Sequence, residues 1–205
     1  MANSLTNDLM HQLQGQPLQQ MSQQLGLEPG EAANAVSAAL PLLMGALGRN
    51  ASQPQGAQAL FGALQKDHAG LDLGSVLGSV LGGGGQGEGS NILGHVFGAR
   101  EQAAAQGLGA ATGMGGDRAN ALLKMLAPIV MAYLAKRMLG GGGGNAQAAS
   151  PQALGEVLGQ EQQQLRQQGG LGGGLLGAVL DRDGDGDADV SDLLKLGGSI
   201  FTGGR

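Results

Sequence analysis

One short stretch of the chain, residues 181–192, has the spacing of acidic side chains expected of a cation-binding loop. Its sequence is DRDGDGDADVSD, with carboxylates at alternate positions and then at the twelfth. A hard cation such as Ca²⁺ takes about six to eight oxygen ligands, and a short loop can wrap around it to supply them. The candidate ligands are Asp181, Asp183, Asp185, Asp187, Asp189 and Asp192. We call residues 181–192 the Asp-rich loop and predict that it binds Ca²⁺, with Mg²⁺ as the alternative ion.

The aspartates fall at the ligand positions of the EF-hand loop, which are 1, 3, 5, 7, 9 and 12, with Gly at 6. Counted from Asp181, Gly186 stands at position 6 and Asp192 at position 12. Because position 12 is Asp and not Glu, the closer resemblance is to Asp-rich, EF-hand-like loops of the dockerin type. In this register Asp187 offers its main-chain carbonyl, and the other five offer carboxylates. The alternative interpretation is a solvated acidic linker.

The Asp-rich loop accounts for the net charge of the chain. All 205 residues together carry 11 basic and 16 acidic side chains, a net charge of −5. The loop, with six Asp and one Arg, also carries −5, so the other 193 residues are neutral. A neutral body lacks the basic patch that nucleic-acid binding needs, and one Tyr, three Phe and no Trp offer little for base stacking. We therefore predict no nucleic-acid partner.

The composition limits the kind of core that can position the loop. With 42 Gly and few aromatic residues, the core must consist of Ala, Leu, Val and Met, which suits closely packed helices. The absence of Cys excludes disulfides, thiol chemistry and zinc–thiolate sites. Runs of Gly at 82–85, 140–144 and 172–174 are typical of flexible linkers.

The first half of the chain has the pattern of consecutive helices. Leu5, Leu9 and Leu13 lie four residues apart and would share one helix face. Pro17, Pro29 and Pro54 are each placed to begin a helix, where the fixed φ and the missing N–H of proline are tolerated. Gly26 is placed to end the second of these helices. Residues 71–81 show a weaker helical pattern before the first Gly run.

The second half continues this pattern. Ser90 is predicted as the N-cap of a short helix that ends near Phe97, and Asp117 as the cap of a long apolar helix that ends at Gly140. A further polar helix is predicted to begin at Ser150 and to carry the apolar residues Leu154, Val157, Leu158 and Leu165. No alternating strand pattern occurs, so we predict an all-α fold, a small irregular helical array.

A weak internal repeat relates the two apolar segments at an offset of 87 residues. SAALPLLMGALGR, which contains Pro41, parallels KMLAPIVMAYLAKR, which contains Pro128. Each segment has a proline inside an apolar helix pattern, and we expect the two helices to pack against each other. Chance similarity between two Ala- and Leu-rich helices is the alternative.

Four segments resemble the bacterial YidB-like family, catalogued as domain of unknown function 937. They are LGLEPGEAANAVSAALPLLMGALGRNAS, PQGAQALFGALQKDHAG, SNILGHVFGARE and ALLKMLAPIVMAYLAKR, and they cover roughly residues 20–140. Members often end in a Gly/Leu-rich stretch followed by LDRDGDG, which this chain has at Leu180 to Gly186. The resemblance implies a small helical array and supplies no catalytic residue.

These observations divide the chain into four segments with different expected roles. We predict a YidB-like helical domain at 1–139, a Gly-rich linker at 140–149, a polar helix at 150–170, and a Gly-rich segment with the Asp-rich loop at 171–205. The expected function is non-catalytic Ca²⁺ binding. The alternative is a structural or self-assembling protein, a homo-oligomer or partner-binding module that uses its apolar helices.

A hydrolase is a further rival, and it would need His68 or His95 to meet a carboxylate. His11, His68 and His95 share no motif, and no hydrolase signature or Walker loop occurs. The dinucleotide spacing G-x-G-x-x-G occurs twice in the Gly runs, but neither match follows a predicted strand, so we interpret both as linkers. No secretory signal is evident at the start of the chain, and the longest apolar run, Met125 to Ala135, is shorter than a membrane span of about 20 residues. A cytoplasmic protein without a transmembrane segment is expected, with leaderless export as the exception.

Overall fold

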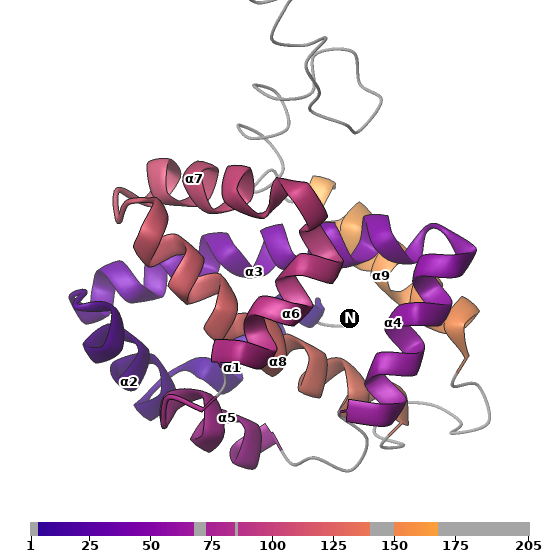
Figure 1. Ribbon diagram of the computed structural model, residues 1–205, viewed down its shortest axis with the longest axis horizontal. Helices are drawn as coiled ribbons and strands as arrows, with labels where there is room; N and C mark the ends of the chain where they lie inside the picture. The colour runs from indigo at the N-terminus through magenta and orange to yellow at the C-terminus, as the bar shows by residue number, and fades with distance from the viewer. Residues whose placement is uncertain (1–3, 68–72, 85, 140–149, 168–205) are drawn as a thin grey trace, which may run out of the picture. The chain divides into compact units, whose positions relative to one another are not determined.

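The computed structural model of the chain describes residues 4–67, 73–84, 86–139 and 150–167. The chain divides into two units, 1–164 and 165–205; the described helices lie in the first, and the last of them ends in the second. Every regular element in the described ranges is helical, so the prediction of an all-α fold is confirmed (Figure 1). The predicted linker at 140–149 and the Gly-rich segment at 171–205 lie outside these ranges.

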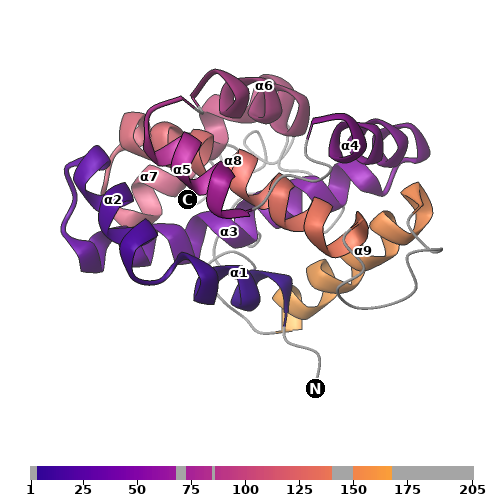
Figure 2. The same ribbon diagram turned by 90° about the horizontal axis from the view of Figure 1, so that it is seen from below.

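The helices are joined by short connections, and their bounds are as follows. The first part of the chain forms α1 (Leu5–Leu13), α2 (Gln16–Leu25), α3 (Pro29–Ala51), α4 (Pro54–Asp67) and α5 (Leu73–Leu81). The second part forms α6 (Gln86–Phe97), the 3₁₀ turn η1 (Gly98–Arg100), α7 (Glu101–Thr112), α8 (Gly116–Leu139) and α9 (Pro151–Gln167). The polar helix predicted at 150–170 is α9, which Figure 2 shows passing the start of α1.

Proline and glycine set several helix boundaries where the sequence predicts them. Pro29 and Pro54 are the first residues of α3 and α4, and Pro17 is the second residue of α2. Proline suits the first turn because its N–H would have no helical partner there. Gly26 follows the last residue of α2 in the left-handed conformation, with φ of 61°, which glycine adopts without a steric cost.

Two predicted helix starts are wrong. Ser90 lies inside α6, which begins at Gln86, and Asp117 lies in the first turn of α8, which begins at Gly116. Neither residue is therefore an N-cap. The glycines before Ser90 favour a linker by composition, yet Gly87 and Gly89 are part of the helix. Packing against α8 overrides the low helix propensity of this Gly-rich stretch.

The sequence pattern does not predict helix α7. Its sequence, EQAAAQGLGAAT, has few large apolar residues, and only Ala105, Leu108 and Gly109 are buried. A Cβ at Gly109 would overlap the main chain of Gly115, so the helix and the following turn need glycine at this point. Small residues produce little hydrophobic periodicity, and that is why the pattern indicates no helix here.

Helix α8 is the centre of the core. All eleven residues from 125 to 135 are buried, so the helix is covered on every side along this stretch. It contacts α2, α3, α4, α5, α6 and α7, and it crosses the middle of the group of helices in Figures 1 and 2. The close approach of α6 depends on Gly89, where a Cβ would overlap the carbonyl of Lys124 in α8.

The two segments of the internal repeat form the two longest described helices, α3 and α8. Shifting the start of α3 by 87 residues gives the start of α8, and Pro41 and Pro128 lie inside the respective helices. The two helices contact each other, as expected. Each follows a helix that ends in a left-handed glycine, Gly26 before α3 and Gly113 before α8.

Helix α3 is also the one described helix that is long and apolar enough to span a membrane, judged by length and composition alone. Half of its most apolar window is buried against the rest of the described chain. The buried helix of a folded core passes the same test, and this burial corresponds to the packing of α3 on α1, α2, α4, α7 and α8.

Candidate functional site

The predicted cation ligands, Asp181, Asp183, Asp185, Asp187, Asp189 and Asp192, lie outside the residues that the structure describes. Binding of Ca²⁺ by the Asp-rich loop therefore stays a prediction from the sequence. Within the described ranges, no group of three or more His, Cys, Asp or Glu side chains could hold a metal ion.

The histidines considered as alternative catalytic residues are separated. His68 lies outside the described ranges, whereas His11 and His95 lie on the exposed sides of α1 and α6. The main-chain carbonyl of His95 accepts a hydrogen bond from Nδ2 of Asn50 at 3.2 Å. This hydrogen bond joins α6 to the C-terminal end of α3, and its role is structural.

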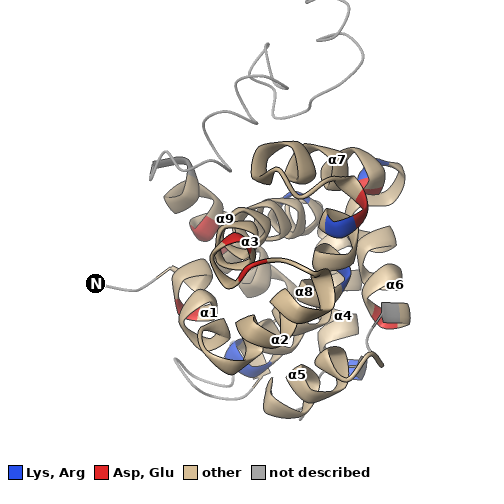
Figure 3. Ribbon diagram, turned by 90° about the vertical axis from the view of Figure 1, so that its left-hand side faces the viewer, with Lys and Arg blue, Asp and Glu red and all other residues tan. Residues whose placement is uncertain are grey.

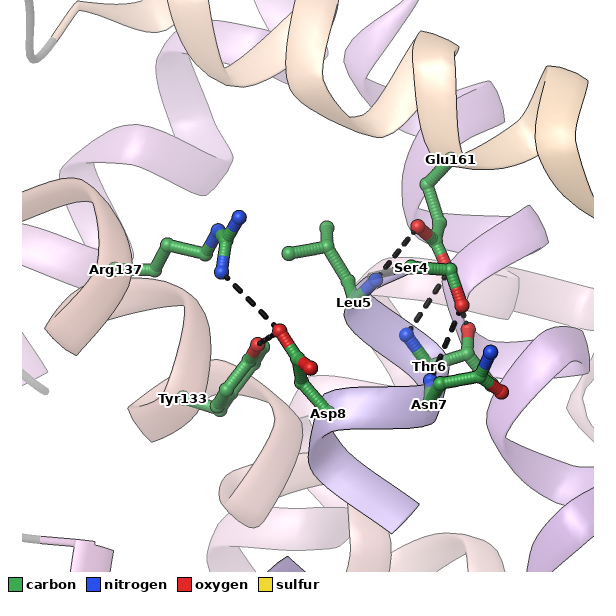
Figure 4. A network of polar contacts seen from close by, with 8 residues as sticks. All are labelled: Ser4, Leu5, Thr6, Asn7, Asp8, Tyr133, Arg137 and Glu161. Atoms are coloured by element: carbon green, nitrogen blue, oxygen red, sulfur yellow. Dashed lines mark hydrogen bonds and ion pairs between the residues drawn. The ribbon is translucent and has the colours of Figure 1, made fainter. Parts of the chain in front are cut away.

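The most unusual polar feature of the described chain is a buried carboxylate, Glu161 of α9. Its residue is only 4% exposed, and its carboxylate accepts three hydrogen bonds from the start of α1 (Figure 4). The main-chain N–H of Leu5 donates to one oxygen at 2.8 Å. The main-chain N–H and the hydroxyl of Thr6 donate to the other at 2.9 and 2.6 Å. Such donors are what a buried acidic group requires, because an unpaired buried charge is very costly.

Together with Ser4, Glu161 satisfies the first turn of α1. The first N–H groups of any helix lack helical partners, and those of Leu5 and Thr6 are taken by Glu161. The next, from Asn7, donates to the Ser4 hydroxyl at 3.2 Å, so Ser4 is the N-cap. The carboxylate also lies at the positive end of the helix dipole, which favours a negative charge.

In the same first turn of α1, Asp8 contacts α8. Its Oδ2 atom lies 3.5 Å from the hydroxyl of Tyr133 and 3.5 Å from Nη1 of Arg137 (Figure 4). The side chains of Arg137 and Asp8 are 41% and 27% exposed, so their ion pair is partly screened by water and worth at most about 1 kcal/mol. The first turn of α1 is thus joined to α9 through Leu5 and Thr6 and to α8 through Asp8.

Tyr133 is the buried member of this second contact. Burial raises the pKa of its phenol above the usual value, with Asp8 acting in the same direction and Arg137 opposing both. The phenol therefore stays protonated at neutral pH and can donate a hydrogen bond to Asp8. Its geometry supports a structural role.

The face of α9 that carries Glu161 is partly predictable from the sequence. The predicted apolar residues of this helix are Leu154, Val157, Leu158 and Leu165, and both Leu154 and Leu158 are fully buried. Val157 and Leu165 are only partly buried, because the buried face is rotated toward Glu161. The sequence signal for this face is the spacing of Leu154, Leu158 and Glu161, which are four and three residues apart.

The described cluster combines one carboxylate whose bonds all go to a helix end with a second carboxylate beside a protonated phenol. Both arrangements hold helices together. They define an all-α protein that is built around one buried helix and has its first helix fastened by side chains from the last two described helices.

Residues 7–137 match the family described as bacterial protein of unknown function (DUF937). Because the match spans more than half of the chain, the protein belongs to this family. The YidB-like family resemblance of residues 20–140 is thereby confirmed. No curated protein and no solved structure shows significant similarity to the chain.

Proposed function

We propose that the chain is a non-catalytic helical protein that binds Ca²⁺ through the Asp-rich loop, with Mg²⁺ as the competing ion. The observation that carries the proposal is the register of the loop. Aspartates stand at positions 1, 3, 5, 7, 9 and 12, and Gly186 stands at position 6, where the EF-hand backbone turns sharply. A solvated linker would need neither this period nor this glycine.

The proposed mechanism is local to the loop. The carboxylates of five aspartates bind the ion, namely Asp181, Asp183, Asp185, Asp189 and Asp192. Asp187 contributes its main-chain carbonyl, as position 7 does in EF-hand loops. Without a cation these side chains repel one another, and a divalent ion removes that repulsion. Ion binding should therefore order the loop and the apolar residues that follow it, Leu193 and Leu194.

The expected affinity is weak. EF-hand loops usually provide a bidentate Glu at position 12, and the shorter Asp192 reaches the ion less well. Position 8, usually a bulky apolar residue, is Ala188, and the chain contains one such loop. We expect a dissociation constant on the order of 10⁻⁴–10⁻³ M, as in extracellular modules. At this strength Mg²⁺ competes, and the bound ion serves a structural role more readily than a sensing one.

The helical body has a different part in the proposal. Outside the loop the chain is neutral, and Figure 3 shows acidic and basic residues of the described helices scattered among one another. The net negative charge of the chain is therefore concentrated in the Asp-rich loop. We propose that the family domain is a scaffold and that the loop is a cation-binding segment attached to it.

The test is calorimetric titration of Ca²⁺ and of Mg²⁺ into the full chain and into Asp185→Ala. We expect saturable heat for the wild-type chain and at least about tenfold weaker binding for the variant, because one of the central ligands is lost. Glu156→Ala is the matched control, since Glu156 is an exposed acidic residue of α9 outside the loop. This control should bind like the wild type.

Circular dichroism in the presence and absence of ion reports whether binding orders the segment. No heat with either ion for the wild-type chain would exclude the metal site. In that case, oligomers that persist in chelator and grow with protein concentration would support the alternative, a self-assembling protein with a solvated acidic linker.

A further inference from the structure

Helix α9 is attached to the body of the protein through one face. Leu154 and Leu158 are fully buried and Glu161 is nearly so. Gln152, Glu156 and Gln160, on the other side of the helix, are exposed. Spacings of four and three residues place the buried residues along a single stripe. The pattern on the buried face of the helix is therefore Leu-x-x-x-Leu-x-x-Glu.

The surface that receives this stripe consists of the first turn of α1 and the C-terminal end of α3, and we call it the α9 docking surface. A Cβ at Gly48 would lie 3.5 Å from the main-chain oxygen of Leu158. A Cβ at Gly155 would lie 3.2 Å from the main-chain oxygen of Ala51. Helices α3 and α9 thus approach closely, with a glycine at the contact on each helix. These glycines give the docking surface a defined shape.

The docking surface and the stripe are also complementary in charge. The start of α1 presents N–H groups and the positive end of a helix dipole, and Glu161 presents a negative carboxylate that accepts three hydrogen bonds from Leu5 and Thr6. Two apolar anchors and one charge-assisted anchor at fixed spacing form a specific recognition pattern. A helix without the acidic residue would leave these buried donors unpaired.

The hydrogen bonds of Glu161 to Leu5 and Thr6 join parts of the chain that the family match does not cover. The match spans residues 7–137, whereas Leu5 and Thr6 precede it and α9 follows it. On its N-terminal side, α9 connects to α8 through residues 140–149, which include five consecutive glycines. Ten residues reach at most about 35 Å when fully extended. The helix is therefore linked to the body by a limited length of chain and by one recognition surface.

We propose that the α9 docking surface also accepts α9 from a second copy of this chain, so that two copies exchange their α9 helices. A helix of identical sequence can bury the same two leucines and accept the same three hydrogen bonds through its own Glu161. Exchange of identical elements is a low-cost route to a dimer. The chain's own α9 competes for the docking surface at an effective concentration of about millimolar. The fraction of exchanged dimer therefore rises with protein concentration.

The test uses cysteine pairs, since the native chain has no Cys. A Cβ at Gly48 would lie 3.8 Å from Cδ of Gln162, so Gly48→Cys and Gln162→Cys place two thiols together. Full chains carrying one substitution each are mixed at rising concentration and oxidised. We expect a disulfide-linked heterodimer whose yield rises with concentration. The control mixture pairs Gly48→Cys with Gln160→Cys, which points about 200° away around the helix and should not form this dimer.

The double variant Gly48→Cys/Gln162→Cys in one chain tests the docking itself. It should form an intramolecular disulfide at low concentration, and failure to do so would overturn the docking surface. An intramolecular disulfide without any heterodimer in the mixture would overturn the exchange.

A second measurement does not depend on substitutions in the body. A fluorescent peptide of residues 150–167 should bind the full wild-type chain, and the same peptide with Glu161→Gln should bind at least about tenfold more weakly. Equal binding of the two peptides, or binding by neither, would contradict the proposal. None of these outcomes depends on added cations, so failure of the Ca²⁺ proposal would leave them unchanged.

Discussion

Glu161 is a buried charge, and such a charge stabilises a protein only when donors surround it. Here the donors are the free N–H groups at the start of α1, so the same bonds satisfy both the carboxylate and the helix end. Removing the charge therefore leaves the donors of Leu5 and Thr6 without their acceptor. That makes Glu161 the residue at which the contact between α1 and α9 can best be tested.

We expect Glu161→Gln to lower the free energy of unfolding by about 2–4 kcal/mol, because the amide directs a donor at N–H groups that also donate. Urea denaturation measures this loss, and amide hydrogen exchange should show faster exchange at Leu5 and Thr6. Glu156→Gln, on the exposed side of the same helix, should change the free energy by less than about 0.5 kcal/mol. Similar effects of the two variants would show that the Glu161 contact contributes nothing specific.

Tyr133 allows a direct measurement, because it is the single tyrosine of the chain and no Trp is present. Burial raises its pKa, so absorbance of the tyrosinate form should appear at a midpoint above about pH 10 in the folded chain and return toward 10 in denaturant. The raised pKa means that the unfolded chain ionises first. The stabilising contribution of this group is therefore full below about pH 10 and is lost as the pH rises through the folded pKa.

The variant Arg137→Gln tests how the neighbours of Tyr133 set its pKa. Arg137 lowers the Tyr133 pKa, so its removal should move the folded midpoint further upward. A folded midpoint at or below about 10 would contradict the burial of the phenol.

The Glu161 contact shows why the roles of single residues are only partly predictable. The buried face of α9 can be inferred in part from the sequence, since Leu154 and Leu158 are buried as expected. The hydrogen-bond partner of Glu161 cannot be inferred in this way. Leu5 and Glu161 are 156 residues apart, and nothing in the sequence around either residue indicates the other. Contacts between distant residues depend on the three-dimensional arrangement of the helices.

At the level of helices, glycine has two opposite roles, and α6 contains both. A Cβ at Gly89 would overlap the carbonyl of Lys124, whereas a Cβ at Gly94 would meet no atom within 4 Å. We expect Gly89→Ala to lower the free energy of unfolding by about 1–3 kcal/mol, because α6 must move away from α8. We expect Gly94→Ala to raise it by about 0.5–1 kcal/mol, because alanine favours a helix.

Chemical denaturation of the two variants decides between packing and propensity. Because both substitutions are Gly→Ala in one helix, the helix-propensity effect is nearly the same in each. If Gly89→Ala stabilises the chain as much as Gly94→Ala does, the close approach of α6 and α8 is absent in solution.

The same distinction explains which helices can be predicted from the sequence. Helices α3, α4 and α9 begin with proline and carry leucines at helical spacing, so their existence and starts are foreseeable. Helix α7 and the first turn of α6 rely on Gly and Ala, which fit because of what packs against them. Small residues therefore produce weak periodicity in the sequence even where they are essential to the packing.

For the whole molecule, charge and packing are assigned to different parts of the chain. The net charge of −5 lies in the Asp-rich loop, outside the described helices, and the remainder is neutral. The candidate cation site stays a prediction, and the sequence allows that prediction because the proposed ligands lie within twelve consecutive residues. The contacts that fasten the helices cannot be predicted in this way, because they join residues that lie far apart along the chain.

The fastening of α1 by Glu161 has a consequence for synthesis on the ribosome. Helix α1 is made first, but two of its first N–H groups have their partner on residue 161. At about 5–20 residues per second, roughly 8–30 s separate the two. During that interval the first turn of α1 has only Ser4 as a cap, so the nascent chain carries an unfinished helix end until nearly all of the helical domain has been made.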